Sequence, residues 1–173
     1  SAMIQIYTGK GKGKTTAGLG LAIRAFGQNM KVALVYFDKG GQDYGERSVL
    51  TKLAIPFFVT GLNRRNEDGT FRFTITDEDR AEAKRGLNLV YDLFHQDYDL
   101  IILDEINSTV ALDMLNETEV CAMMQAKPAN LELVMTGRNV PASMLELADL
   151  VTEMTPIKHY FNKGVPARRG IEF

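Results

Sequence analysis

The sequence predicts an α/β protein built on a mainly parallel β-sheet with helices on both faces. Three observations lead to this fold class. Segments with strand character alternate with segments of helical periodicity along the chain, which is typical of βαβ units. Several strand segments are almost continuously apolar, as expected of parallel strands covered on both faces. A glycine-rich loop joins the first strand to the first helix, which is where phosphate-binding α/β proteins carry such a loop.

The first half of the chain predicts three strands and two helices. Residues 3–7 alternate and are rich in β-branched side chains, which favours a strand, and the apolar residues of 17–26 recur at helical spacing. Residues 31–37 form a continuous apolar run of strand length. We then expect a glycine-rich loop over residues 38–46, a short helix over residues 47–53 and a short strand over residues 56–59.

The second half predicts one long helix, three strands and several short helices. Thr76 and Asp79 have the spacing of a capping box, so a helix is expected to begin there and to run to about Gln96. Residues 99–105 form an apolar strand that ends in two acids. The remaining expected elements are two short helices ending near residue 127, a strand over residues 131–138, a short helix over residues 141–147 and a strand over residues 150–154.

Length and composition indicate a single globular domain. The chain has 173 residues, of which 45% are hydrophobic and 24% charged, and we expect one domain over residues 3–173 with Ser1 and Ala2 as an expression remnant. The net charge of −2 does not favour nucleic acid as a partner. The sequence shows no membrane span and no signal peptide, and its single cysteine, Cys121, fits a reducing compartment. We therefore expect a cytoplasmic protein without a membrane partner.

Residues 8–16, TGKGKGKTT, predict a phosphate-binding loop. Its glycines allow the backbone to turn tightly, so that successive N–H groups and the N-terminus of the next helix surround an anion. Lys14 would reach the phosphates, and the Thr15 hydroxyl would face a phosphate-bound Mg²⁺. The usual G-x-x-x-x-G-K-[ST] spacing would place the first glycine at Thr8, whereas here it is Gly9. A lysine-rich exposed turn is the alternative, but the flanking strand and helix favour a nucleotide site.

Two other strand ends supply candidate partners for this loop. Asp104 and Glu105 end an apolar strand in the manner of a Walker B element, and either carboxylate could hold a metal ion directly or through water. Arg138 ends the strand over residues 131–138, where it runs into a turn, and could clamp a phosphate, although an exposed arginine after a turn is the alternative. Arg24 lies within the first helix, where spacing alone indicates a surface or ion-pairing residue.

Residues 60–75 lack helical periodicity and predict a long irregular loop. Such loops in compact domains are usually lids, binding loops or disordered segments. Phe71 and Phe73 flank Arg72 within this otherwise polar stretch. The two aromatic residues suggest contact with a flat apolar partner, and anchoring of the loop to the core is the alternative.

Taken together, the motifs resemble those of the P-loop ATP:corrinoid adenosyltransferases over nearly the whole chain. The displaced first glycine matches the form of the loop in that family, and the C-terminal motifs are more specific than the loop. The segments that carry the resemblance are residues 8–16, 20–25 (GLAIRA), 38–40 and 45–46, 103–107 (LDEIN), 136–141 (TGRNVP), 148–154 (ADLVTEM), 158–161 (KHYF) and 169–173 (RGIEF).

The resemblance implies a RecA-like P-loop fold, usually found as a homodimer, and an adenosyl transfer reaction. The 5′-deoxyadenosyl group of ATP would pass to the cobalt of a reduced corrinoid, and triphosphate would be released. ATP and the corrinoid are then substrates, and Mg²⁺ or Mn²⁺ is the expected metal. The electrons that reduce the cobalt would come from an external reductant such as a flavoprotein.

The resemblance also assigns roles to particular residues. Lys14, Glu105 and Phe73 are the candidate catalytic residues, and Thr15 and Glu105 are the candidate metal ligands. Arg24 and Arg138 would contact ATP or its metal, which gives Arg24 a role that spacing alone does not. The residues expected to bind the triphosphate are Gly9, Lys10, Gly11, Lys12, Gly13, Lys14, Thr15 and Thr16.

The sequence departs from the family pattern in the loop before the long helix. The family has phenylalanine followed two residues later by tryptophan, whereas this chain has Phe73 and Ile75 and contains no tryptophan. In related enzymes these aromatic side chains help to displace the lower ligand of the cobalt. Ile75 could exclude that ligand by its bulk, which leaves corrinoid preference open. The chain also begins almost at its first strand, without the N-terminal extension of some relatives.

Two other classes of function compete with adenosyl transfer. A RecA-like ATPase or motor would use Glu105 to activate water for attack on the γ-phosphate, but a motor would be expected to have further domains or a basic surface for nucleic acid. A nucleotide-dependent binding or regulatory protein would use the same loop without turnover. The products formed from ATP and a reduced corrinoid distinguish the three.

Overall fold

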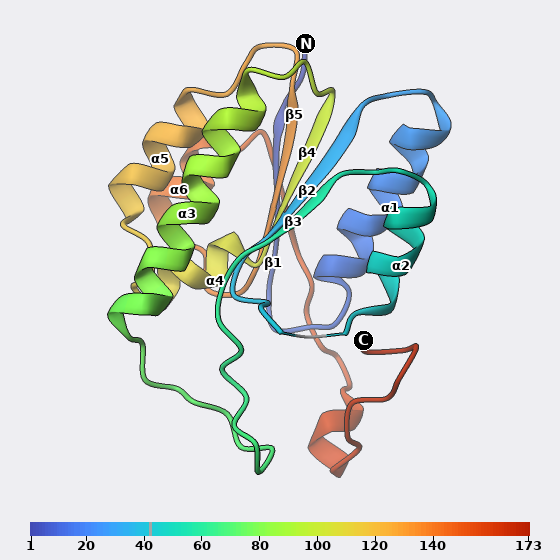
Figure 1. Ribbon diagram of the computed structural model, residues 1–173, viewed down its shortest axis with the longest axis vertical. Helices are drawn as coiled ribbons and strands as arrows, with labels where there is room; N and C mark the ends of the chain where they lie inside the picture. The colour runs from blue at the N-terminus through green and yellow to red at the C-terminus, as the bar shows by residue number, and fades with distance from the viewer. Residues whose placement is uncertain (42) are drawn as a thin grey trace.

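The computed structural model describes residues 1–41 and 43–173 as a six-stranded sheet between two layers of helices (Figure 1). The strands lie in the order β3-β2-β4-β5-β1-β6, and all five neighbouring pairs are parallel. The elements are β1 Ile4–Thr8, α1 Lys14–Gly27, β2 Val32–Tyr36, α2 Gly45–Lys52, β3 Phe57–Val59, α3 Asp77–Phe94, β4 Leu100–Asp104, α4 Ile106–Ala111, α5 Glu117–Gln125, β5 Glu132–Thr136, α6 Ala142–Leu147, β6 Leu150–Glu153 and the 3₁₀ helix Tyr160–Lys163.

The predicted α/β class is confirmed, and the sheet is parallel throughout the described chain. Each predicted strand and helix is present within a few residues of its expected position, while the 3₁₀ helix in the tail was not expected. The capping box at the start of α3 is also present. The Thr76 hydroxyl accepts a hydrogen bond from the backbone N–H of Asp79, and the Asp79 carboxylate accepts one from the N–H of Thr76. Gln42, within the predicted glycine-rich loop, lies outside the described residues.

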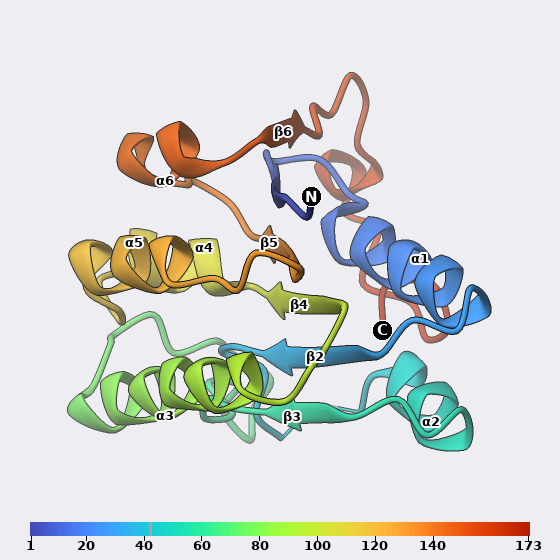
Figure 2. The same ribbon diagram turned by 90° about the horizontal axis from the view of Figure 1, so that it is seen from above.

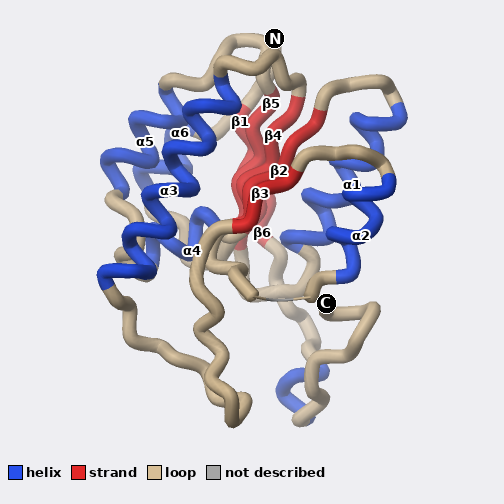
Figure 3. The backbone as a smooth tube through the Cα atoms, in the orientation of Figure 1, coloured by secondary structure: helices blue, strands red, loops and turns tan. Residues whose placement is uncertain are grey.

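The helices divide between the two faces of the sheet, as Figures 2 and 3 show. Helices α1 and α2 cover one face, and α3, α4, α5 and α6 cover the other. Every residue of β2 and β4 is buried, which explains their continuous apolar sequences. The edge strand β6 differs, because all four of its residues are exposed. None of the described helices has the length and apolar character needed to cross a bilayer.

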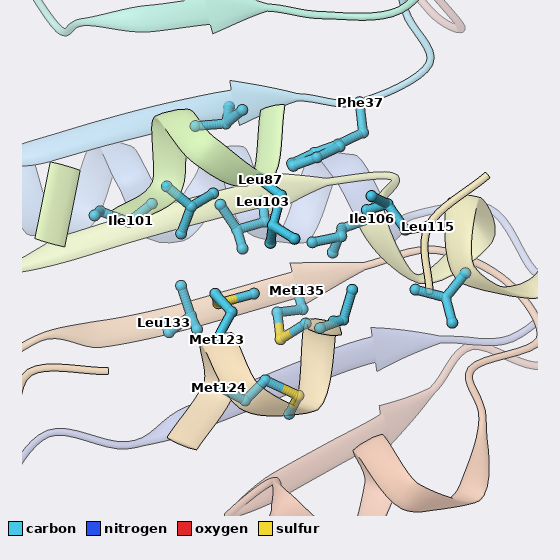
Figure 4. Close-up of a cluster of buried hydrophobic side chains, with 14 of the residues drawn as sticks. Phe37, Leu87, Ile101, Leu103, Ile106, Leu115, Met123, Met124, Leu133 and Met135 are labelled. Atoms are coloured by element: carbon cyan, nitrogen blue, oxygen red, sulfur yellow. The ribbon is translucent and has the colours of Figure 1, made fainter. Parts of the chain in front are cut away.

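Two apolar clusters hold the layers together. The larger cluster lies between the sheet and helices α3 to α6, where Phe37, Leu87, Leu103 and Met135 pack together (Figure 4). The smaller cluster includes Ala22 of α1 and lies on the opposite face. Full burial of a Leu, Phe or Met side chain contributes roughly 1.5–3 kcal/mol to folding. These clusters fix the carboxyl ends of the strands, where the loops that carry polar residues begin.

Candidate active site

The phosphate loop connects β1 to α1 and is shaped by contact with the end of β6. Gly9 has a φ of +100°, and a side chain there would bring its Cβ within 2.4 Å of the Met154 carbonyl oxygen. The N–H of Gly11 donates a hydrogen bond of 2.7 Å to the same carbonyl. This close approach accounts for the glycine at position 9, one residue later than in the usual motif.

Lys14 begins α1 and bends back over the loop. Its ammonium donates a hydrogen bond of 2.8 Å to the Gly11 carbonyl, and the residue is only 8% exposed. Burial lowers the pKa of Lys14, and the nearby charge of Arg138 lowers it further, while Glu105 and Asp104 oppose the shift. An anion in the loop would favour the charged form of this side chain.

Asp104 is the acid that lies at the phosphate loop. It ends β4, is 1% exposed, and its Oδ1 accepts hydrogen bonds of 2.8 Å from the hydroxyls of Thr15 and Thr136. Its Oδ2 forms an ion pair with the Lys39 ammonium. Burial alone would lower the pKa of Lys39, but the charges of Asp104 and Glu105 outweigh burial and raise it above its ordinary value. Asp104 therefore links the first turn of α1, the end of β5 and the loop after β2 through its two oxygens.

Glu105 faces the cavity in front of the loop. It adopts a left-handed backbone conformation with a φ of 67°, and its N–H donates to the Thr136 hydroxyl at 3.0 Å. Its carboxylate accepts a hydrogen bond of 3.0 Å from Ser108 in the first turn of α4. Burial and the charge of Asp104 raise the pKa of Glu105, and Lys39 counteracts part of the shift. A bound cation would stabilise its charged form.

A cavity of about 470 Å³ opens in front of the phosphate loop. One wall is the loop with the start of α1, and the opposite wall is the C-terminal tail, which Figure 1 shows below the carboxyl edge of the sheet. The lining residues are Gly11, Lys12, Gly13, Lys14, Thr15, Thr16, Lys39, Tyr44, Glu105, Arg138, His159, Tyr160, Phe161, Val165, Pro166, Ala167, Ile171 and Glu172.

Lys12 connects the loop to the tail. Its ammonium donates hydrogen bonds to the Tyr160 hydroxyl at 3.1 Å and to the Ile171 carbonyl at 3.3 Å, and it lies 3.7 Å from the Glu172 carboxylate. The Tyr160 hydroxyl in turn donates to Glu172, and Arg168 pairs with the same carboxylate. The hydrogen bond from Tyr160, with those from Arg168, lowers the pKa of Glu172 to about 2. The tail is thus folded against the loop by charged groups.

The structure brings most of the predicted phosphate and metal residues together. Residues 11–16, Glu105 and Arg138 all line the cavity. Gly9 and Lys10 belong to the loop but lie outside the lining, and the Lys10 side chain is exposed.

Two predicted residues lie elsewhere within this chain. Arg24 is exposed in the last turn of α1, ten residues after Lys14 and so roughly 15 Å along the helix. Phe73 is 81% exposed on the loop that precedes α3, and its ring lies 5.2 Å from that of Phe71. Figure 1 shows this loop extending beyond the same edge of the sheet as the C-terminal tail.

Sequence reasoning missed Lys39 and the residues of the tail as parts of the site. Lys39 follows β2, and its position after a buried strand was a usable signal, because the other strand ends also supplied site residues. Tyr160 and Glu172 are about 150 residues from the loop, and no spacing indicates their contact with Lys12. The sequence also left open which acid faces Thr15, and the structure places Asp104 there.

The residues at the loop fit a hard divalent cation such as Mg²⁺. No group of three or more His, Cys, Asp and Glu side chains suited to a metal occurs among the described residues. Mg²⁺ commonly needs only one or two protein carboxylates, with phosphates and water completing its octahedron. The Thr15 hydroxyl and the carboxylates of Asp104 and Glu105 offer that kind of donor set, and an ammonium group already lies at Asp104.

The parallel sheet and the glycine-rich loop between β1 and α1 give the chain an α/β fold of the RecA-like P-loop class. In a comparison of solved structures, the flagellar accessory protein FlaH from Methanocaldococcus jannaschii is similar in fold, with a TM-score of 0.58. The match covers 88% of this chain and 70% of that chain at 15% sequence identity, so it bears on the fold alone. Parallel strands with a phosphate loop after β1 are consistent with this class.

Sequence comparisons identify the family. The family described as ATP:corrinoid adenosyltransferase BtuR/CobO/CobP matches residues 1–173. The corrinoid adenosyltransferase CobA of Salmonella typhimurium is 36% identical over 173 residues, covering 99% of this chain and 85% of its own length. The corrinoid adenosyltransferase of Escherichia coli K12 is 37% identical with the same coverage, and that of Pseudomonas aeruginosa is 34% identical over 174 residues, covering 99% and 83%. The chain belongs to the ATP:corrinoid adenosyltransferase family.

Proposed function

We propose that this protein transfers the 5′-deoxyadenosyl group of ATP to the Co(I) centre of a reduced corrinoid and releases triphosphate. The observation that carries the proposal is the family match over residues 1–173, which includes the phosphate loop and the tail that faces it. The relatives in Salmonella typhimurium and Escherichia coli bear the corresponding name.

The cavity has the size and charge that ATP requires. Its volume of about 470 Å³ lies within the range typical of small-molecule sites. Lys12, Lys14, Lys39 and Arg138 contribute positive charge to its lining, and the N-terminus of α1 points at the loop. These groups would hold the triphosphate, and the aromatic part of the tail would cover the rest of the nucleotide.

The reaction needs alignment and charge stabilisation more than proton transfer. The electron pair of Co(I) attacks C5′ of ATP, the cobalt–carbon bond forms, and the C5′–O bond breaks with its electrons leaving on triphosphate. No proton moves in this step, so the protein needs no general base. Lys12, Lys14 and the loop N–H groups would stabilise the negative charge that develops on the departing triphosphate.

Thr15, Asp104 and Glu105 are the proposed holders of Mg²⁺ or Mn²⁺. Thr15 and Asp104 are joined by a hydrogen bond of 2.8 Å, and Glu105 faces the same cavity. When bound, the cation would neutralise charge on the phosphates of the leaving group. The contribution of these three residues is to fix oxygen donors beside the phosphate loop.

The loop between Gly61 and Ile75 is the proposed corrinoid contact. It lies beyond the same sheet edge as the ATP cavity (Figure 1), and its most exposed aromatic side chain is Phe73. A corrin ring is broad and largely apolar, so covering it would bury the Phe73 ring and exclude water from the cobalt. Ile75 packs partly against the core cluster and stands where the family has tryptophan.

The compartment, the oligomeric state and the source of electrons are proposed from the family resemblance. We propose that the protein acts in the cytoplasm as a homodimer and that an external reductant, such as a flavoprotein, supplies the electrons for the cobalt. A homodimer would also give Arg24 and the exposed strand β6 possible partners in the second copy.

The test is product identification after incubation with ATP, Mg²⁺ and chemically reduced cobalamin. Adenosylcobalamin and triphosphate in equal amounts would support the proposal. ADP and phosphate without a cobalt–carbon product would show an ATPase instead. Stable binding of ATP without turnover would show a regulatory or binding protein.

A further inference from the structure

The Lys39 ammonium contacts two of the three proposed metal ligands, Asp104 and Thr15. Its ammonium forms an ion pair with Asp104 Oδ2 and lies 3.5 Å from the Thr15 hydroxyl. Its side chain is 12% exposed, and the rings of Tyr44 and Tyr36 lie 5.0 Å and 5.6 Å from its ammonium. Lys39 is thus a buried internal cation at the carboxylate beside the phosphate loop.

One carboxylate oxygen at this depth would not readily serve Lys39 and a divalent cation together. Two positive charges a few ångströms apart repel each other, and burial weakens the screening by water. Asp104 keeps its hydrogen bonds from Thr15 and Thr136 through the other oxygen, so it remains fixed if the lysine leaves. The Asp104 oxygen that pairs with Lys39 can therefore bind either the Lys39 ammonium or a metal ion, but not both together.

The polyphosphate offers the ammonium a second partner within reach. Lys39 lines the same cavity as Lys12 and Lys14, so a short movement of its flexible side chain would bring it toward bound phosphate. Within the described part of the chain, the carboxylates that act on the ammonium are those of Asp104 and Glu105. Nucleotide and metal together would then replace the Lys39–Asp104 pair by a metal–Asp104 contact and a Lys39–phosphate contact.

The backbone on either side of Lys39 is held in place, so exchange would involve the side chain. The preceding residue, Asp38, accepts hydrogen bonds of 2.9 Å and 2.8 Å from the guanidinium of Arg64. The N–H of Lys39 donates to the Thr60 carbonyl at 3.2 Å. Gly61 packs so closely that a Cβ there would lie 2.6 Å from the Cα of Asp38. These contacts also tie Lys39 to the start of the proposed corrinoid loop.

We propose that Lys39 is a positioning residue that holds the Asp104–Thr15 pair in the nucleotide-free protein and exchanges Asp104 for the polyphosphate when metal and ATP bind. This inference rests on the proposed metal site at Asp104. The exchange makes metal binding depend on nucleotide, because metal alone must displace the Lys39 ammonium from Asp104 while no phosphate is present to pair with that ammonium. It also gives the triphosphate a further cation in the reactive complex.

The test measures Mn²⁺ binding, without any turnover, by the electron paramagnetic resonance signal of free Mn²⁺. Titrations are run on the full chain without nucleotide and with ATP. Lys39→Met removes the competing charge, so nucleotide-free Mn²⁺ should bind about tenfold more tightly, and the gain in Mn²⁺ affinity on adding ATP should shrink. Lys39→Gln should behave in the same way, while Lys39→Arg should stay close to wild type.

Two further variants distinguish a failure of the exchange role from a failure of the proposed metal site. Lys84→Met is the matched control, since Lys84 pairs with Glu119 at 3.0 Å on the surface and should leave both titrations unchanged. Asp104→Asn should weaken Mn²⁺ binding in the presence of ATP. If it does so while Lys39→Met and Lys39→Gln, both folded by thermal melting, bind nucleotide-free Mn²⁺ as wild type does, the exchange role is refuted and the metal site stands. If Asp104→Asn has no effect, both the metal site and the exchange role are refuted.

Discussion

Replacing Phe73 by alanine should impair the corrinoid step and leave both the fold and ATP binding intact. Phe73 is 81% exposed, so removal of its ring leaves no cavity in the core. Its neighbour Phe71 remains anchored, since the guanidinium of Arg64 lies 4.6 Å from the Phe71 ring and is itself held by Asp38. The phosphate loop is a separate part of the site, because Phe73 is not among the residues that line the ATP cavity.

The expected size of the effect follows from that exposure. An aromatic side chain buries roughly 150–250 Å² when fully covered. Because the residue is 81% exposed, a corrin ring could cover about 160 Å² of it. At about 25 cal/mol per Å², and allowing for the Cβ that alanine keeps, full coverage corresponds to about 3 kcal/mol and half coverage to about 1.5 kcal/mol. We therefore expect kcat/KM for the corrinoid to fall roughly 10- to 150-fold.

The assay follows cobalt–carbon bond formation at saturating ATP with reduced corrinoid varied, and ATP affinity is measured separately by calorimetry. Phe26→Ala is the matched control, since Phe26 is an exposed phenylalanine in the last turn of α1. Hydrogen exchange of the loop between Gly61 and Ile75, with MgATP and with or without corrinoid, tests whether it closes. Normal corrinoid kinetics in Phe73→Ala together with equal exchange in both states would refute the role of the loop.

Four further substitutions test other parts of the site and its support. Lys14→Ala should lower kcat/KM by about 100-fold or more, equivalent to roughly 2.7 kcal/mol, because a buried ammonium at the triphosphate is lost; near-normal turnover of the folded variant would contradict the phosphate role. Glu105→Gln should weaken the dependence of turnover on Mg²⁺, measured by metal titration, whereas an unchanged dependence would rule out a metal role for this carboxylate. Asp79→Asn should cost about 2 kcal/mol in the free energy of unfolding, because the capping box and the ion pair with Arg72 are weakened. Hydrogen bonds from Arg72 and Thr76 hold the pKa of Asp79 below its ordinary value, so the stabilisation of the fold by the Asp79 carboxylate is present above about pH 4 and is lost as the pH falls through the depressed pKa. The difference in the free energy of unfolding between Asp79→Asn and wild type should therefore narrow in acid. A constant difference across the acid range would contradict this. Ile75→Trp should raise the rate with cobalamins that carry a lower ligand if the site uses an aromatic side chain to displace it, and an unchanged rate would show that the isoleucine suffices.

The features that the sequence predicted correctly are those encoded over short stretches of chain. The glycine-rich connection from β1 into α1 is marked by nine consecutive residues, 8–16, and the capping box of α3 depends on Thr76 and Asp79, three positions apart. The apolar runs of β2 and β4 follow directly from burial on both faces. In each case the physical cause is local, so a pattern of neighbouring residues is enough to predict the structure.

The features that the sequence did not predict depend on contacts between distant parts of the chain. Which acid meets Thr15 depends on the left-handed turn at Glu105, which directs Asp104 and Glu105 to different surroundings. The wall that the tail forms across the cavity depends on Lys12 reaching Glu172 from the other end of the chain. The displaced glycine, which no spacing rule explains, is required by the Met154 carbonyl.

The central claim is that cobalt attacks C5′ of ATP held in the phosphate loop, and bond cleavage at C5′ tests it most directly. The protein is incubated with Mg²⁺, a chemically reduced corrinoid and ATP that carries ¹⁸O in the bridge between C5′ and the α-phosphorus. The products are then analysed by mass spectrometry. Attack at C5′ predicts that all of the label is found in triphosphate, in equal amount to the adenosylated corrinoid. Label retained in a nucleoside or in ADP, with phosphate as the other product, would contradict adenosyl transfer.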